Sequence, residues 1–88
     1  MTNDKFVQIS GPFRNGEEVI DKIKKDYGDF RNVTHIGIQT ETGHGVYLNG
    51  QFFEIGKTGI LQFNEIQIGS IYFAQNENAS TLVDCVLD

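Results

Sequence analysis

The stretch Val46–Phe63, VYLNGQFFEIGKTGILQF, decides the fold of this 88-residue chain. Within it, Asn49-Gly50 separates two pairs of alternating apolar residues, Val46 and Leu48 before it and Phe53 and Ile55 after it. Asn-Gly between alternating apolar residues is the strongest short-range signal for a β-hairpin, because a type I′ turn needs positive φ at both central positions. The stretch therefore predicts hairpin strands over Val46–Leu48 and Gln51–Ile55.

The register of this hairpin assigns its side chains to two faces. With a two-residue loop, Tyr47 lies opposite Phe52 and Val46 lies opposite Phe53. One face then carries Val46, Leu48, Phe53 and Ile55, and the other carries Tyr47, Phe52 and Glu54. Because both faces hold bulky apolar groups, two interpretations stay open. Either the hairpin is covered on both sides, or Tyr47 and Phe52, together with Tyr72, form an exposed aromatic patch for a partner or a sugar ring.

The flanking sequence predicts further short strands separated by Gly-, Asn- and Thr-bearing turns. One of them, Ile66–Ala74, changes apolar parity across Gly69, which predicts a β-bulge or a sharp bend there. The pattern gives a mainly β fold of six or seven short strands, an antiparallel β-sandwich or small barrel with one N-terminal helix. The predicted strands are Lys5–Ile9, Val33–Gln39, Val46–Leu48, Gln51–Ile55, Ile60–Phe63, Ile66–Ala74 and Thr81–Leu87.

One helix is predicted over Glu17–Tyr27, ahead of a β region that spans residues 33–88. Its apolar residues recur along one stripe, which must dock on a sheet, since three turns are not stable alone in water. Asn15 is the candidate N-cap and Gly28 suits the position after the last turn. The loop Ser10–Gly16 precedes the helix. A chain of this length forms a single domain, residues 1–88.

Composition and charge narrow the class of protein. The apolar fraction of 39% and charged fraction of 22% are those of a folded globular chain. The net charge of −5 disfavours nucleic-acid binding, which needs Lys and Arg to replace counterions. The opening MTNDKFVQIS has no apolar core, so no signal peptide is expected, and no apolar run is long enough to span a membrane.

The chemistry-bearing residues favour structural interpretations. A metal or proton-transfer role for His44 with Glu41, or for His35, lacks the third ligand of a zinc site, so no metal is expected. Cys85 is the one cysteine, which excludes an internal disulfide, and we expect it to be a buried apolar residue. Gly56–Gly59, GKTG, lacks the earlier glycine of a P-loop and predicts a β-turn.

Two pairs of carboxylates complete the candidate catalytic groups, Glu41 with Glu54 and Glu65 with Glu77. Scattered carboxylates occur in any β domain, and their spacing in sequence gives no productive separation. We therefore expect no enzyme, no catalytic residue and no cofactor.

Three segments carry a resemblance, THIGIQ (34–39), YLNGQFFEIGKTGILQF (47–63) and IQIGSIYF (66–73). They resemble small β-rich structural or attachment domains of tailed-bacteriophage or prophage virion proteins, in which a G-I-Q segment leads to an I-N-G-x-x-F-x-I-G-x-T-G-I-like hairpin. The likeness spans roughly residues 33–87. Where such domains end in an aromatic-bearing strand, this chain has Asp84-Cys85-Val86. The resemblance implies a non-enzymatic module, in the virion or in the host cytoplasm during assembly, and supplies no catalytic residues.

Three functions follow as hypotheses. The first is a virion structural or attachment protein that acts through protein–protein contacts, as a homo-oligomer or with other virion proteins. The second is a carbohydrate-binding module with Tyr47, Phe52 and Tyr72 as an exposed, coplanar platform. The third is a small acidic inhibitor of a host protein, which would require a contiguous acidic surface around Asp21, Asp26 and Asp29.

Overall fold

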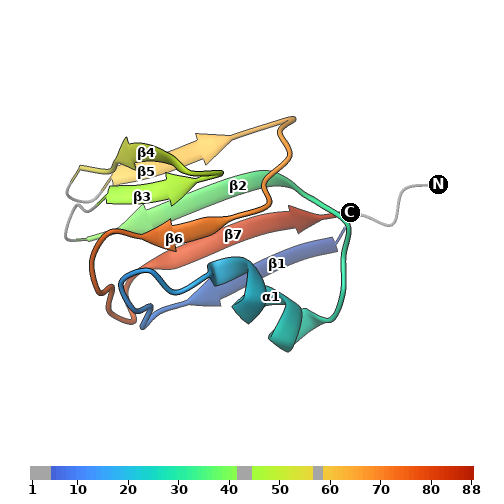
Figure 1. Cartoon of the computed structure of the whole chain (residues 1–88), viewed down its shortest axis with the longest axis horizontal. Helices are drawn as coiled ribbons and strands as arrows, with labels where there is room; N and C mark the ends of the chain where they lie inside the picture. Colours follow the sequence, from blue (N-terminus) through green and yellow to red (C-terminus); the bar gives the residue numbers. More distant parts are fainter. Residues whose placement is uncertain (1–4, 42–44, 57–58) are drawn as a thin grey trace.

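The computed structural model describes residues 5–41, 45–56 and 59–88. Its elements are, in chain order, β1 (Lys5–Ser10), α1 (Val19–Tyr27), β2 (Val33–Thr40), β3 (Gly45–Leu48), β4 (Gln51–Glu54), β5 (Gly59–Phe63), β6 (Ile71–Phe73) and β7 (Leu82–Leu87). The predicted mainly β fold with one early helix is confirmed. The order of the elements is easily followed in Figure 1.

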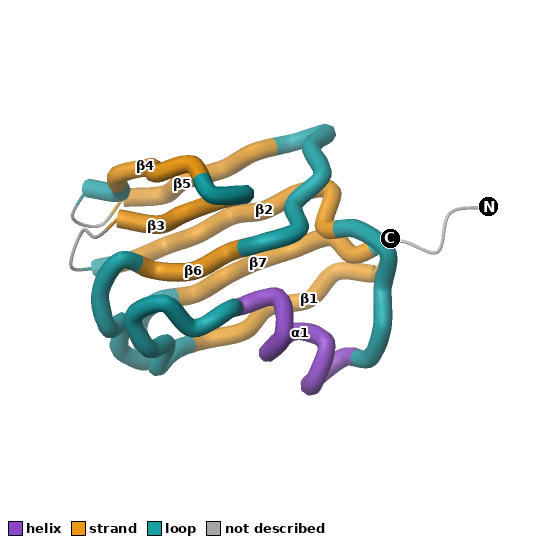
Figure 2. Tube along the Cα trace, viewed as in Figure 1, coloured by secondary structure: helices purple, strands orange, loops and turns teal. Residues whose placement is uncertain are grey.

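The strands form two antiparallel sheets, which decides between the two predicted architectures in favour of a sandwich. The larger sheet has the order β1-β7-β2-β5 and the smaller one the order β4-β3-β6. Figures 1 and 2 show the smaller sheet lying over one face of the larger sheet, with α1 beside β6 in the same layer. All elements of the second layer therefore cover the same face of the four-stranded sheet.

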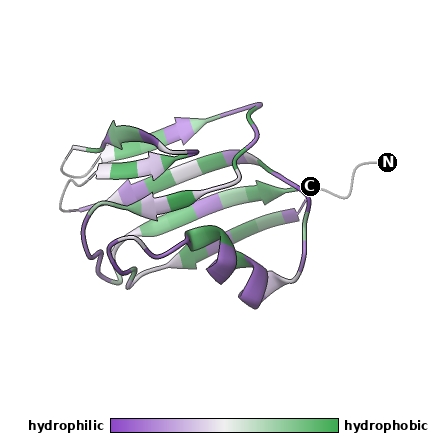
Figure 3. Cartoon of the chain, in the orientation of Figure 1, coloured by the Kyte–Doolittle hydropathy of each residue, from purple (hydrophilic) through white to green (hydrophobic). Residues whose placement is uncertain are grey.

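The core fills the space between these two layers. Alternate residues of each strand point inward, including Val46 and Leu48 of β3, and Val83 and Cys85 of β7. The hairpin face predicted from Val46, Leu48, Phe53 and Ile55 is the inner one: three of these side chains are buried and Phe53 is half-buried. Hydrophobic residues concentrate in the strands, while the helix and loops carry many of the hydrophilic ones (Figure 3).

The predicted helix starts two residues too early. α1 begins at Val19 with Glu18 as its N-cap, and not at Glu17 with Asn15 as the cap. The Glu18 carboxylate accepts hydrogen bonds from the Ile20 N–H at 3.3 Å and from the Ile71 N–H at 2.7 Å. The cap is thus shared between α1 and the first residue of β6. A contact so distant in sequence leaves no local signal, which is why the prediction failed.

The Asn49-Gly50 turn forms as predicted, with φ of 51° at Asn49 and 82° at Gly50. Asn49 also has a second role. Its side-chain Oδ1 accepts the Gly69 N–H, and its Nδ2 donates to the Gln67 carbonyl, each at 2.8 Å. The hairpin turn therefore holds a segment that lies 18 to 20 residues further along the chain.

That segment corrects the prediction of one strand over Ile66–Ala74. Ile66 and Ile68 donate hydrogen bonds to Thr34 and Val33 of β2, in the larger sheet, whereas Ile71–Phe73 pairs with β3 in the smaller one. The chain crosses from one sheet to the other at Gly69. The parity change marks a sharp break, as predicted, but only Ile71–Phe73 forms a strand, while Ile68 makes an isolated bridge to Val33.

Candidate functional site

The outer face of the three-stranded sheet carries the predicted aromatic residues in one row. Tyr47 on the central strand β3 pairs with Phe52 on β4 and with Tyr72 on β6. The Tyr47 and Tyr72 rings stack with centroids 4.8 Å apart and an interplanar angle of 14°. Phe52 meets Tyr47 edge-on, with centroids 5.2 Å apart. The register thus brings all three predicted site residues together.

The geometry of this aromatic row differs from a flat platform. The centroid separation of 4.8 Å equals the spacing of neighbouring strands, so the two tyrosine rings extend from adjacent strands with their faces toward each other. Phe52 is 50% exposed, and Tyr47 and Tyr72 are half-buried. A Cβ added at Gly45 would lie 2.2 Å from the Phe52 ring, so Phe52 covers the backbone of that glycine. The three rings therefore make most of their contacts with one another and with the sheet.

The outer face of the four-stranded sheet has no described element covering it, because α1 and the smaller sheet lie on the opposite face (Figure 1). We call it the bare face. Strand pairing arranges its outward side chains in three rows across the sheet. The rows are Phe6–Val86–His35, Gln8–Asp84–Gly37–Gln62 and Ser10–Leu82–Gln39–Ile60.

Phe6 is the most exposed of the large apolar side chains on the bare face. It is 83% exposed, compared with 58% for Ile60 in the row furthest from it. The sequence held a signal for this position, since Phe6 alternates with Val7 and Ile9 in KFVQI and so falls on the opposite face from them. Val7 and Ile9 are buried, which leaves an aromatic ring on the solvent side.

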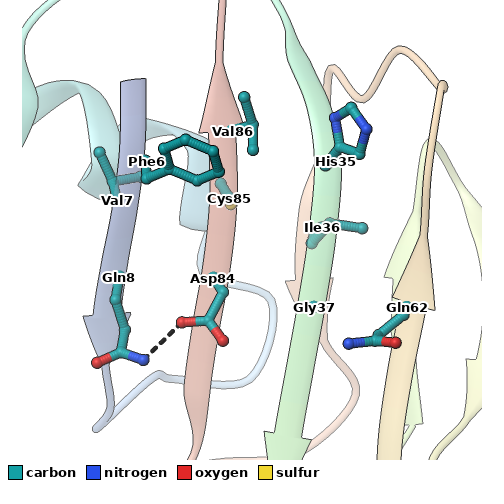
Figure 4. Close-up of a pocket in the computed structure, with 10 residues that line it drawn as sticks. All are labelled: Phe6, Val7, Gln8, His35, Ile36, Gly37, Gln62, Asp84, Cys85 and Val86. Atoms are coloured by element: carbon teal, nitrogen blue, oxygen red, sulfur yellow. Dashed lines mark hydrogen bonds between the residues drawn. The ribbon is translucent and has the colours of Figure 1, made fainter. Parts of the chain in front are cut away.

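Gly37 makes a hollow in the middle of the bare face. It lacks a side chain where neighbouring strands present Asp84 and Gln62, and the resulting open groove has a volume of about 550 Å³. Figure 4 shows Asp84 and Gln62 on either side of Gly37, with Phe6, Val86 and His35 further along the strands. Asp84 Oδ1 accepts a hydrogen bond of 2.6 Å from Gln8 Nε2, which fixes the carboxylate.

The surroundings of the next candidate residues, Cys85 and His35, favour structural roles. Cys85 is buried as expected, and its burial, helped by the negative charge of Asp84, raises the pKa of the thiol from 9.0 to about 12. A thiol with that pKa stays protonated and weakly nucleophilic near neutral pH. His35 is half-buried, with Nδ1 3.1 Å from Thr34 Oγ1. The Gly59 N–H donates a 2.9 Å hydrogen bond to the Gly56 carbonyl, while Lys57 and Thr58, the middle of the predicted turn, lie outside the described residues.

The candidate carboxylates differ in burial. Glu77 is 3% exposed, and it accepts hydrogen bonds from the hydroxyl groups of Thr40 and Thr81 at 3.3 and 3.1 Å. Glu41, Glu54 and Glu65 are exposed. His44, which we paired with Glu41, lies outside the described residues. The geometry assigns Glu77 to a buried polar contact between β2 and the start of β7.

Within residues 5–41, 45–56 and 59–88, no three His, Cys, Asp or Glu side chains are grouped so that they could hold a metal ion. In the same ranges, no helix has the length and apolar character needed to cross a membrane.

Comparison with known proteins adds no assignment. No protein-family model matches the chain, and neither the curated proteins nor the solved structures gave a match.

Proposed function

We propose that this chain is a non-enzymatic structural or attachment protein of a bacteriophage virion that acts through protein–protein contacts. The single observation that carries the binding part of this proposal is the bare face, on which Phe6 is 83% exposed. The likeness of residues 34–39, 47–63 and 66–73 to virion domains supports the phage origin. The proposed setting is the virion, or the host cytoplasm during assembly.

The composition of the bare face suits a protein partner. Asp84 is the only formally charged residue in its three rows, although 19 of the 88 residues of the chain are Asp, Glu, Lys or Arg. Depletion of charge together with an exposed aromatic group is typical of the centre of protein interfaces. The net charge of −5 supports a protein rather than a nucleic-acid partner.

Self-association is part of the same proposal, and the exposed part of Phe52, the ring that the aromatic row covers least, provides a separate surface for it. Phe52 at one end of the row is half exposed, and the row lies on the opposite side of the sandwich from the bare face. Sedimentation velocity at micromolar concentration tests this point. We expect an oligomer that Phe52→Ala weakens, and a monomeric mass would contradict self-association.

The carbohydrate alternative has less support. A platform for sugar rings needs free, coplanar ring faces, whereas Tyr47 is stacked on Tyr72 on one side and meets Phe52 on the other. The inhibitor alternative needs a contiguous acidic surface. On α1, the acidic residues Asp21 and Asp26 are instead interspersed with Lys22, Lys24 and Lys25. Neither geometry favours these functions over protein binding.

Site-specific photo-cross-linking tests the proposed function. p-Benzoylphenylalanine in place of Phe6 is expected to cross-link to a virion structural protein in phage-producing cells, with the adduct identified by mass spectrometry. The same group in place of the exposed Asp26 on α1 is the matched control and is expected to give no such adduct. Equal adducts at both positions, or none at Phe6, would contradict the proposal.

A further inference from the structure

We infer that the bare face binds a protein segment that places an arginine side chain over Gly37, against the carboxylate of Asp84. This inference rests on the proposed protein-binding function and names the chemistry of the partner. Asp84 lies on β7, one of the two inner strands of the sheet, in the middle of the three rows.

The Asp84 carboxylate is oriented toward the hollow. Gln8 holds Oδ1 at 2.6 Å, while Oδ2 lies 3.9 Å from the point where a Gly37 Cβ would stand. Gln62 reaches the same point from the other side, with its Cγ at 3.8 Å (Figure 4). The hollow is thus bordered by a carboxylate and by an amide whose oxygen can accept a hydrogen bond.

Four of the six described Lys and Arg residues have other contacts, and the remaining two, Arg14 and Lys25, lie in the loop before α1 and on α1, in the layer on the opposite face of the sheet. Lys5, Lys22 and Lys24 lie over the rings of Tyr27, Phe13 and Phe30, and Arg31 pairs with Asp88. The three rings belong to α1 or its flanking loops, away from the centre of the bare face. A cation for Asp84 is therefore expected from outside the chain.

The charge of the whole β region favours the same occupant. Residues 32–88 contain six carboxylates and one lysine, so they hold the entire net charge of −5, while residues 1–31 contain six of each sign. Two copies packed by their bare faces would place two Asp84 carboxylates in one interface, and the rows of either face contain no Lys or Arg to offset their repulsion. A cationic partner removes that repulsion.

Arginine fits this site better than lysine. Its planar guanidinium offers five donors in a fixed fork, enough for both Asp84 and the Gln62 amide oxygen. The absence of a side chain at Gly37 leaves room for a flat group against the sheet. The apolar stem of an arginine can pack along Val86 and Phe6, which lie one row away.

Peptide selection tests the inference. A displayed library of random heptapeptides is panned on the purified wild-type chain and, separately, on Asp84→Asn, which keeps the shape and the Gln8 acceptor but removes the charge. We expect wild-type selections to enrich arginine flanked by apolar residues. A synthetic peptide from that pool should bind Asp84→Asn at least tenfold more weakly. Glu54→Gln, on the other outer face, loses the same charge and should bind normally.

A second variant tests the hollow separately from the charge. Gly37→Val fills the hollow with a side chain whose Cβ would lie 3.8 Å from its nearest neighbour, an ordinary van der Waals distance, and it should also weaken binding at least tenfold. Selections without arginine enrichment, or equal binding by Asp84→Asn and wild type, would overturn the inference. So would a wild-type dimer that Gly37→Val dissociates, because it would assign the face to a second copy. Cross-linking at Phe6 to a virion protein would leave the proposed function standing in each of these cases.

Discussion

On the outer face of the three-stranded sheet, Tyr47 has an aromatic ring on each side, whereas Phe6 on the bare face makes no ring contact with any described residue. The first face satisfies its apolar groups internally by cross-strand stacking. The second face leaves a ring exposed, a hollow at Gly37 and a carboxylate held toward it. Aromatic content alone therefore does not identify a binding surface; the contacts that the rings make within the chain do.

The reactivity of the buried Cys85 thiol measures how well the four-stranded sheet shields the core from solvent. This reactivity has the largest expected effect. A pKa of about 12 instead of 9.0 leaves about a thousandfold less thiolate at pH 8 than in the unfolded chain. We expect labelling by a disulfide reagent to be slower by at least that factor in the folded protein. Labelling is followed with and without urea, and rapid labelling of the folded chain would show that the bare face opens to solvent.

The same thiol predicts a loss of stability in alkali. The folded state keeps the proton of Cys85 up to about pH 12, whereas the unfolded state loses it above about pH 9. Stability from this group is present below pH 9 and falls as the pH rises between these two values. Urea titrations of wild type and Cys85→Ala at pH 7 and pH 10 measure the difference, and an equal pH dependence in both would contradict the assignment.

Tyr47→Ala breaks the aromatic row at its centre. It removes two ring contacts of about 0.5–1.5 kcal/mol each, together with half-buried apolar area, so we expect unfolding to be easier by about 2 kcal/mol. Phe52→Ala, at the end of the row, should cost less because it loses one ring contact. Urea unfolding of both single variants and the double variant gives their coupling, and purely additive effects would contradict a stabilising edge-on contact between Tyr47 and Phe52.

Asn49→Gly tests the connection between the two sheets. Glycine keeps the positive φ of the turn but loses the two side-chain hydrogen bonds to Gln67 and Gly69. We expect a loss of about 1–2 kcal/mol, and faster amide exchange at Gly69, measured by NMR. Asn49→Asp, which keeps the acceptor for Gly69, is the control and should lose less. An unchanged stability in Asn49→Gly would limit the role of Asn49 to the turn.

The sequence predicted those features that depend on neighbouring residues. The Asn49-Gly50 turn and the two hairpin faces were correct because φ preference and strand alternation act locally. The break at Gly69 was also visible, but the hydrogen bonds of Ile66 and Ile68, before the break, go to Thr34 and Val33, more than 30 residues earlier.

Other features were missed because two distant segments define them. Phe13, placed in a loop by prediction, is buried and bridges to Glu77. In β2, the spacing from Val33 to Ile36 departs from strict alternation, and the structure has a register shift there. The bare face itself follows from where α1 and the smaller sheet dock. Strand periodicity indicates which residues share a face, but not which face remains uncovered.

Phe6→Ala gives the smallest expected change in stability and so sharpens the comparison with Tyr47→Ala. The Phe6 ring is 83% exposed, and truncation of an exposed side chain away from packed contacts changes unfolding free energy by about 0.5 kcal/mol or less. The same substitution at Tyr47 should cost several times more, although both positions are aromatic residues on outward faces. Urea unfolding at pH 7 measures both. A loss above about 1 kcal/mol at Phe6 would mean that its ring packs on the sheet, and the bare face would then resemble the aromatic row in satisfying its own apolar groups.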